Sequence, residues 1–405
     1  MRGQTVTGTR GGIGLVVHSG GPTPVINASL VGVIEEARKH PEIAGLYGAA
    51  YGLDGVLREN FIDLFAQNQE TLRAIASTPS SALGTSRLEI GDAEIEQALK
   101  IFRAYNVRYF FCTGGNGSMG AASQIMRLAA ESGSGLQVIG IPKTIDNDLA
   151  ETDHTPGYPS TARFFACAVR DIGADNRALP GQVEFVEVLG RNAGWLVAST
   201  CLARQEPDDA PHLIYFPEVR LALEQLLDDV DRVYRRLGRC VVAVCEGQLD
   251  GRGEPFGADV RKGSRGSLAM NLGHRLALLV SERLKLKARS EKPGLLGRSH
   301  WGDQPQLDRA EAHLCGQAAV RAACQGFSGV MVTLLRERGV EYRISTGVAP
   351  LQHVALVERL FPAEWRNAAG NDVLPAFHDY VMPLVGTIPH YERLSSIPPA
   401  KKSGT

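Results

Sequence analysis

The N-terminal half of the chain repeats one unit, in which a short apolar run leads into a polar or glycine-rich turn and usually then into an amphipathic stretch. Five apolar runs show the pattern, at residues 13–17, 107–112, 136–141, 183–189 and 241–245. Apolar strands that alternate with helices predict parallel sheets covered by helices on both faces. Such folds bind ligands beyond the carboxyl ends of their strands, which is where the unusual residues of each unit fall. The sequence therefore predicts an α/β enzyme.

The length and charge of the chain limit the classes of protein to which it can belong. Its 405 residues exceed what one hydrophobic core usually organises, so we expect two lobes. Lys and Arg total 43 against 44 for Asp and Glu, and this balance argues against a nucleic-acid partner. No apolar run approaches the roughly 20 residues that span a bilayer, and the polar N-terminus lacks the apolar stretch of a signal peptide. We therefore expect a cytoplasmic protein without a membrane partner.

Two glycine-rich turns stand between a predicted strand and a predicted helix, at residues 19–21 and 114–117. Backbone N–H groups that converge at such a turn, together with the positive end of the helix dipole, form a phosphate cradle. Glycine lets an anion approach without a Cβ in the way. Neither turn is a Walker A loop or a GxGxxG dinucleotide motif. The two turns together favour phosphate binding.

The segment KTIDND at residues 143–148 follows the third apolar run. In an extended chain Thr144, Asp146 and Asp148 share one face. One carboxylate could then act as a base while the other binds Mg²⁺, which takes one or two protein carboxylates plus substrate phosphates. Lys143 supplies a positive charge for a phosphate. A solvated acidic loop is the alternative, and the position at a strand end beside the glycine turns argues against it.

Other charged residues could complete such a site. Arg87 and Arg191 could neutralise charge on a transferred phosphoryl group. Glu246 follows the last apolar run and could accept hydrogen bonds from sugar hydroxyls. Lys292 and Arg298 could bind a sugar phosphate. Taken singly, each arginine is more often a surface residue than a catalytic one.

Five linked motifs stand in order along the chain: GGP with VINA at 20–28, TGGNGS at 113–118, PKTIDND at 142–148, TDHTPG at 152–157 and VEVLGR at 186–191. Their sequences and their order resemble the phosphofructokinase A family. The similarity covers roughly residues 13–250 and continues more loosely to about Asp308. The resemblance implies two Rossmann-like lobes with parallel-rich sheets, an active site in the cleft between them, and assembly as a homodimer or homotetramer.

The family fold also implies a division of the chain. Residues 1–145, with part of the C-terminal region, would form the lobe that binds the phosphoryl donor, and residues of about 146–310 the lobe that binds the sugar phosphate. Residues of about 311–394 would pack back on the lobes. The polar tail at 395–405 would be flexible.

The resemblance assigns roles in the chemistry by position. Asp146 would be the base that takes the proton from the 1-hydroxyl of fructose 6-phosphate, and Thr144 would hydrogen-bond near the reacting centre. Arg191 and Arg87 would stabilise the charge on the phosphoryl group during its transfer. Gly20 would cradle the donor phosphates.

It also implies the metal and sugar contacts. Asp148 and Asn116 would hold the cofactor Mg²⁺, with Asn116 at a position where ATP-using members usually carry Asp. The sugar phosphate would be contacted by Leu189, Gly190, Glu246, Lys292 and Arg298. Gln182 stands where an arginine is expected.

The residues that resemble those of one or another branch of the family point to different phosphoryl donors. Gly117 resembles the ATP-using members, whereas Lys143 and the Gly21-Pro22 pair resemble the pyrophosphate-using ones. Gly117 only removes an obstacle to a nucleotide, but the Lys143 ammonium can stabilise a phosphate leaving group, which can be worth several kcal/mol in a water-poor site. The charge argument favours pyrophosphate as the donor, and the resemblance then implies reversible transfer from pyrophosphate to fructose 6-phosphate, serving glycolysis and gluconeogenesis. ATP is the alternative donor, and sedoheptulose 7-phosphate remains open as a further acceptor.

Two other classes of protein remain open. The strand–glycine–helix units could belong to an NAD-dependent oxidoreductase, although GxGxxG with a following acidic residue is absent. A non-catalytic sugar-phosphate sensor would have lost the base, yet Asp146 and Asp148 are intact.

The seven cysteines include no CxxC pair and predict free thiols rather than a zinc site. Nothing in the spacing of His18 and His154 requires more than a structural role.

Overall fold

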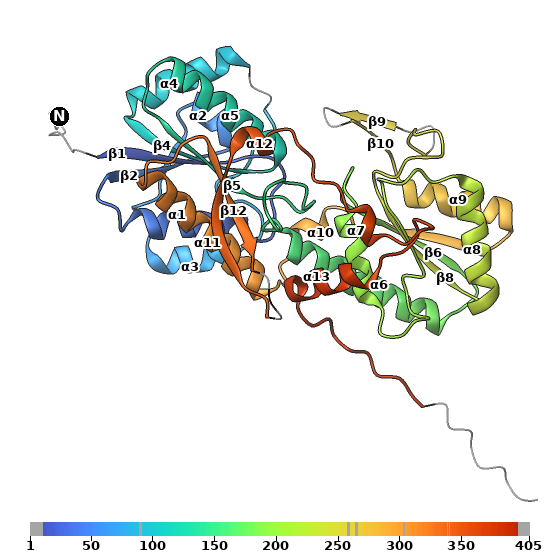
Figure 1. Ribbon diagram of the computed structural model, residues 1–405. Helices are drawn as coiled ribbons and strands as arrows, with labels where there is room; N and C mark the ends of the chain where they lie inside the picture. The colour runs from blue at the N-terminus through green and yellow to red at the C-terminus, as the bar shows by residue number, and fades with distance from the viewer. Residues whose placement is uncertain are drawn as a thin grey trace, which may run out of the picture.

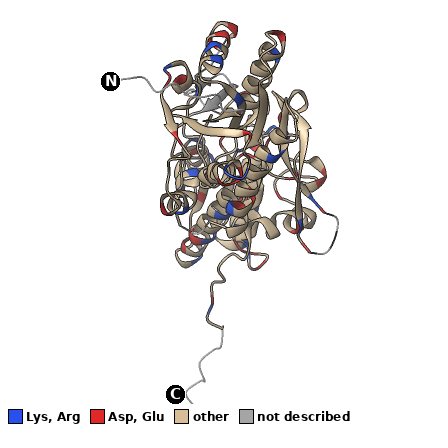
Figure 2. Ribbon diagram, turned by 90° about the vertical axis from the view of Figure 1, so that its left-hand side faces the viewer, with Lys and Arg blue, Asp and Glu red and all other residues tan. Residues whose placement is uncertain are grey.

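The computed structural model describes residues 11–88, 91–256, 260–263, 266–302, 304–337, 339 and 341–395. Two large sheets, each covered by helices, form two lobes, as the sequence predicted (Figure 1). Basic and acidic residues are interspersed along the ribbon, which agrees with the near-zero net charge (Figure 2). Within the described ranges, no helix combines the length and the apolar character that crossing a membrane requires. All seven cysteines are free thiols.

The first lobe is built on a seven-stranded sheet. Across the sheet the strands are β13 (Ile344–Pro350), β12 (Val330–Arg336), β5 (Gln137–Pro142), β4 (Val107–Gly114), β1 (Gly12–His18), β2 (Ile43–Ala49) and β3 (Phe61–Asp63). The five central strands are parallel, and the two edge strands run antiparallel to their neighbours. Because β1, β4 and β5 lie side by side, their carboxyl ends bring the loops at 19–21, 114–117 and 143–148 to one edge.

Helices cover both faces of this sheet. One face carries α1 (Ile26–Ala37), α3 (Gln69–Ala76) and α11 (Gln306–Cys324). The other carries α2 (Gly52–Leu57), α4 (Asp92–Ala104), α5 (Asn116–Glu131) and α12 (Leu351–Val354). Helices α1 and α11 cross closely, because a Cβ at Gly32 would lie 2.1 Å from His313 O and a Cβ at Gly316 would lie 2.1 Å from Ser29 O. The core of the first lobe therefore includes a helix from the C-terminal part of the chain.

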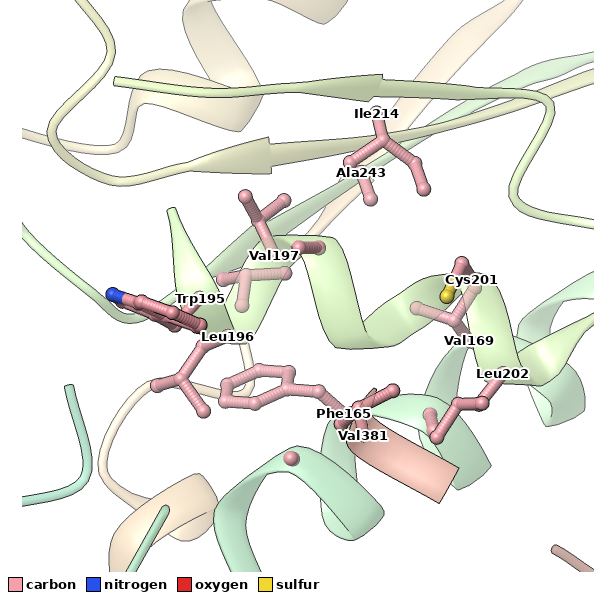
Figure 3. Close-up of a cluster of buried hydrophobic side chains, with 14 of the residues drawn as sticks. Phe165, Val169, Trp195, Leu196, Val197, Cys201, Leu202, Ile214, Ala243 and Val381 are labelled. Atoms are coloured by element: carbon pink, nitrogen blue, oxygen red, sulfur yellow. The ribbon is translucent and has the colours of Figure 1, made fainter. Parts of the chain in front are cut away.

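The second lobe is built on a parallel sheet in the order β11 (Ala288–Glu291), β6 (Val183–Val188), β8 (Cys240–Cys245) and β7 (Leu213–Tyr215). One face packs on α6 (Tyr158–Ala178), α7 (Trp195–Ser199), the 3-10 helix η1 (Thr200–Ala203) and α13 (Pro375–Val385). The other face packs on α8 (Leu223–Leu237) and α9 (Leu272–Leu284). Figure 3 shows α7 between the strands that carry Ile214 and Ala243 and the helices that carry Phe165 and Val381.

Smaller elements complete the chain. The hairpin of β9 (Val260–Gly263) and β10 (Gly266–Ala269) follows the second sheet's β8, α10 (Leu296–Ser299) packs on α6, and the 3-10 helix η2 (Ala363–Trp365) precedes α13. The chain passes between the lobes three times: from β5 to α6, from α10 to α11, and from α12 to α13 (Figure 1). The assignment of donor and sugar phosphate to particular lobes stays a prediction. Most of the predicted flexible tail, residues 396–405, lies outside the described residues.

Candidate active site

The turn after β1 lies against a buried lysine. Gly20 has a φ of +78°, which favours glycine, and its N–H donates to Ser86 O at 3.1 Å. Lys143 is only 3% exposed, and its Nζ donates to Ser19 O at 2.9 Å and to Gly21 O at 2.7 Å. A Cβ at Gly20 would lie 3.4 Å from this Nζ. Two residues predicted to bind the donor phosphates, Gly20 and Lys143, are therefore in contact although they follow different strands.

The charge of Lys143 also acts on a neighbouring histidine. Burial, and after it the charge of Lys143, lowers the pKa of His18 to about 3. His18 Nδ1 lies 2.7 Å from Ser81 Oγ. The imidazole is therefore neutral at pH 7, and its hydrogen bond agrees with the structural role expected for it.

Thr144 and Asp146 begin the loop after β5. The Asp146 N–H donates to Thr144 Oγ1 at 3.1 Å, and the Thr155 hydroxyl donates to Thr144 O at 2.8 Å. Asn147 has a φ of +54°, so the extended chain assumed for this segment is interrupted there, and its Oδ1 accepts from the Thr155 N–H at 3.0 Å. Asp146 is half-buried, whereas Asn147 and Asp148 are buried. A carboxylate that stays accessible on a fixed loop suits a general base.

Asn116 and Asp148, the predicted metal ligands, lie in direct contact. Asn116 opens α5, and its Nδ2 donates to Asp148 Oδ2 at 2.9 Å and to Asp148 O at 3.1 Å. Both side chains are 5% exposed, and Oδ1 of each has no hydrogen-bond partner within the part of the chain that the structure describes. Two buried oxygens of this kind fit Mg²⁺, which prefers oxygen ligands and keeps further positions for substrate phosphates.

Two arginines, Arg87 and Arg298, lie beside the turn after β1. A Cβ at Gly21 would lie 2.1 Å from Arg298 Nη1 and 3.7 Å from Arg87 Nη2, so both guanidinium groups lie at this turn. Burial, followed by the charge of Arg87, lowers the pKa of Arg298, and Arg191 acts in the same direction. The carboxylate of Asp146 opposes the shift. The two cations at this turn, with Arg191 and the predicted base within electrostatic reach of Arg298, form a site for an anion such as a phosphoryl group.

Arg191 and Glu246 approach each other from the ends of β6 and β8. Gly190 has a φ of +139° and Arg191 a φ of +48°, so the chain turns sharply after β6. A Cβ at Gly247 would lie 1.7 Å from Arg191 O, which shows how closely the two loops approach. Burial raises the pKa of Glu246, and the charge of Arg191 opposes the rise. The structure therefore brings these two predicted site residues together.

Other predicted residues lie in different surroundings. Lys292 Nζ lies 2.6 Å from Oε1 of the buried Glu187, so its charge is paired within this chain. Gln182 precedes β6 whereas Leu189 follows it, which separates them by roughly 20 Å along the strand. Gly117 is exposed in the first turn of α5. Arg298 lies at the turn of Gly21, and the roles predicted for Arg298, Lys292 and Gly117 stay predictions.

His154 connects the loop after β5 to the first lobe. Its Nδ1 lies 2.9 Å from Asp153 Oδ2 and its Nε2 lies 2.7 Å from Glu311 Oε2. Burial lowers the pKa of His154, but the hydrogen bonds and charges of the two carboxylates outweigh it and raise the pKa above its usual value. The Tyr342 hydroxyl donates to Glu311 Oε1. These contacts agree with the structural role expected for this histidine.

One contact of the loop has no signal in the sequence pattern. Arg359 donates from Nη2 to Asn147 O at 2.9 Å and from Nε to the same oxygen at 3.2 Å, across 212 residues of chain. No motif or periodicity marks the segment around Arg359. The sequence alone therefore gives no indication that Arg359 contacts this loop.

Comparisons with known proteins find relatives over most of the chain. The family model described as Phosphofructokinase matches residues 14–323. A pyrophosphate–fructose 6-phosphate 1-phosphotransferase from Rhodospirillum rubrum is 39% identical to this chain, over 92% of this chain and 94% of that protein. A pyrophosphate-dependent phosphofructokinase structure from Marinobacter aquaeolei has a TM-score of 0.84 at 33% identity, covering 96% of each chain. One from Nitrosospira multiformis has a TM-score of 0.86 at 31% identity, covering 96% of this chain and 95% of that chain.

Proposed function

Because this chain belongs to the phosphofructokinase family, we propose that it transfers a phosphoryl group reversibly from pyrophosphate to the 1-hydroxyl of fructose 6-phosphate. The products are fructose 1,6-bisphosphate and phosphate. The observation that carries the choice of donor is the Lys143 ammonium, which is buried against the turn that holds Gly20. ATP, the alternative donor, is favoured only by the absence of a side chain at Gly117.

Lys143 supports pyrophosphate because of where its charge is fixed. The carbonyls of Ser19 and Gly21 hold the ammonium at the glycine turn, where donor phosphates would bind. When the bond to the transferred phosphoryl group breaks, the leaving phosphate gains negative charge. A buried cation in place beforehand stabilises that charge without reorganisation. The ammonium would also occupy the place where the α-phosphate of a nucleotide donor would lie, and pyrophosphate has no such group.

The loop after β5 supplies the base. Asp146 accepts the proton of the sugar 1-hydroxyl as that oxygen attacks phosphorus, and the half-buried carboxylate is accessible for this contact. Arg87 and Arg191 neutralise charge on the phosphoryl oxygens during the transfer, and Arg298 is kept for the sugar phosphate. Leu189, Gly190 and Glu246 follow the strands of the second lobe and contact the sugar.

Mg²⁺ is the proposed cofactor. Oδ1 of Asn116 and Oδ1 of Asp148 would be its protein ligands, with donor phosphate oxygens completing the shell. When bound, the ion neutralises phosphate charge and orients the donor. The expectations of a cytoplasmic location and of a homodimer or homotetramer stay predictions.

The test is the formation of fructose 1,6-bisphosphate from fructose 6-phosphate and Mg²⁺, with pyrophosphate and ATP compared side by side. Turnover with pyrophosphate and little with ATP supports the proposal. Turnover with ATP alone contradicts pyrophosphate as the donor but does not contradict the assignment of Asp146 as the base. Sedoheptulose 7-phosphate, offered under the same conditions, measures how strictly the acceptor is selected.

A further inference from the structure

The chain crosses from α12 in the first lobe to α13 in the second through residues 355–361, the C-terminal strap (Figure 1). This segment follows the last strand of the first sheet and carries none of the motifs of the N-terminal half. It contacts both loops that carry the proposed chemistry, the loop of Asp146 after β5 and the loop of Arg191 after β6. Its position makes it a candidate for controlling how these loops meet.

The strap holds the loop of Asp146 by its backbone. The Arg359 N–H donates to Asp148 O at 2.8 Å, and Glu358 forms an isolated antiparallel bridge with Leu149. The same Asp148 carbonyl accepts from the Asn116 side chain. The residue proposed to bind Mg²⁺ is thus held from one side by α5 and from the other by the strap.

The Arg359 guanidinium forms further hydrogen bonds to the same loop. Nε and Nη2 donate to Asn147 O at 3.2 and 2.9 Å. Nη1 donates to Asp153 O at 2.7 Å and also to Thr152 O. One planar group therefore collects carbonyls from both ends of the loop, and Asn147 among them has a positive φ of 54°. Lysine could not make these contacts, because its single nitrogen lacks the fork of donors.

The strap holds the loop of Arg191 as well. Asn192, the next residue after Arg191, donates from Nδ2 to Glu358 Oε2 at 3.1 Å. Trp195 donates from Nε1 to Arg359 O at 2.9 Å, and the Arg359 guanidinium stands 4.5 Å from the Trp195 ring centroid. Adjacent residues of the strap thus contact the neighbour of the proposed base and the neighbour of the proposed phosphoryl-binding arginine.

We infer that Arg359 is a positioning residue: its guanidinium holds the loop of Asp146 and stands over Trp195, which follows the loop of Arg191, and so sets Asp146 and Arg191 against the same phosphoryl group. The inference rests on the proposed function, because it assumes that these two residues act on one reacting centre. Phosphoryl transfer depends almost wholly on positioning and charge stabilisation. A misplacement of about 1 Å can cost about 100-fold in rate. The strap is therefore expected to affect turnover more than binding.

The test compares Arg359→Met and Arg359→Lys with a matched control, Arg170→Met. Arg170 also donates to three backbone carbonyls, those of Ala203, Leu202 and Pro389, and lies over an aromatic ring, but it is on α6 away from both loops. Arg359→Met is expected to lower kcat about 100-fold and to leave the KM for fructose 6-phosphate within about 3-fold. Arg359→Lys keeps the charge but lacks the forked donors of the guanidinium, so its kcat should lie between those of the wild type and Arg359→Met. If Arg359→Met does not fold, Arg359→Lys alone carries the comparison.

A second readout needs no turnover. Hydrogen exchange of the amides at 146–153, measured without substrates, should be faster in the Arg359 variants than in the wild type and unchanged in Arg170→Met. The inference is overturned if the Arg359 variants keep kcat within the range of the control, or if the loop amides exchange as in the wild type. Failure of the wild type to use pyrophosphate would instead overturn the proposed function, and the exchange result would still report whether the strap holds the loop.

Discussion

Asn116 and Asp148 face each other across a hydrogen bond of 2.9 Å, and within the described residues Oδ1 of each side chain has no hydrogen-bond partner. The neutral amide is what lets this pair stay together without a cation, because an amide can donate to a carboxylate. A second carboxylate in its place could only accept, and two like charges in a buried site repel. The charge at residue 116 therefore determines how far the site depends on Mg²⁺.

Asn116→Asp should make the stability of the protein depend more strongly on Mg²⁺. Without the ion the variant should melt at a lower temperature than the wild type, and Mg²⁺ should raise its melting temperature by more than it raises that of the wild type. The control is Asn371→Asp, because Asn371 Nδ2 likewise donates to buried Asp229 Oδ2, at 2.8 Å, in the second lobe. Equal Mg²⁺ effects on both variants would place the metal elsewhere.

Lys143→Met should lower kcat/KM for pyrophosphate by about 100- to 1,000-fold, because the leaving phosphate loses its fixed cation. The KM for fructose 6-phosphate should stay within about 3-fold. Steady-state kinetics with each substrate varied in turn measure both values. Since Ser19 O and Gly21 O also lose their donor, thermal unfolding must show that the variant is folded at the assay temperature. Unchanged use of pyrophosphate would refute the role of this lysine.

Asp146→Asn should lower kcat by about 100- to 10,000-fold, since the amide cannot accept the hydroxyl proton. Binding of fructose 6-phosphate, measured by calorimetry, should change much less, because the substitution keeps the size of the side chain. Near-normal turnover by this variant would show that another group acts as the base.

His154→Gln should remove a contribution to stability that depends on pH. The pKa of His154 is raised in the folded protein, because its hydrogen bonds to Asp153 and Glu311 outweigh burial. Its charged form therefore stabilises the fold fully below the unfolded pKa of about 6.5, and this contribution is lost as pH rises through the folded value. The pKa of Asp153 is lowered, so this carboxylate titrates only at acid pH and does not change stability between about pH 6 and about pH 9. Urea unfolding should show a larger difference between wild type and variant at about pH 6 than at about pH 9, and a difference independent of pH would contradict the assignment.

Gly32→Ala should destabilise the first lobe by about 1–3 kcal/mol. The new Cβ would lie 2.1 Å from a backbone carbonyl, His313 O on α11, so no change of side-chain rotamer can relieve the contact. Gly302→Ala is the control, because no described atom lies within 4 Å of a Cβ there. Denaturant unfolding of both variants measures the difference, and equal stabilities would show that the two helices can separate at little cost.

Much of the site follows from the sequence because the carboxyl ends of parallel strands meet at one edge. Once β1, β4 and β5 are expected as neighbours, the nearness of Lys143 to Gly20 and of Asn116 to Asp148 follows from their places just beyond those strands. The rest depends on side chains whose partners lie far along the chain. The contact of Arg359 with the base loop and the pairing of Lys292 with Glu187 leave no periodic or compositional signal.

The order of the strands has a consequence for synthesis of the chain. When the ribosome has synthesised the chain through β11, all strands of the second sheet are present, but only five of the seven strands of the first sheet are. Until β12 emerges, β5 is an open edge of parallel sheet, and until α11 emerges, the close-packing surface of α1 around Gly32 is uncovered. The lobe that begins the chain is thus completed only after the sheet of the lobe that follows it, so its folding cannot finish cotranslationally before residues 306–350 have left the exit tunnel.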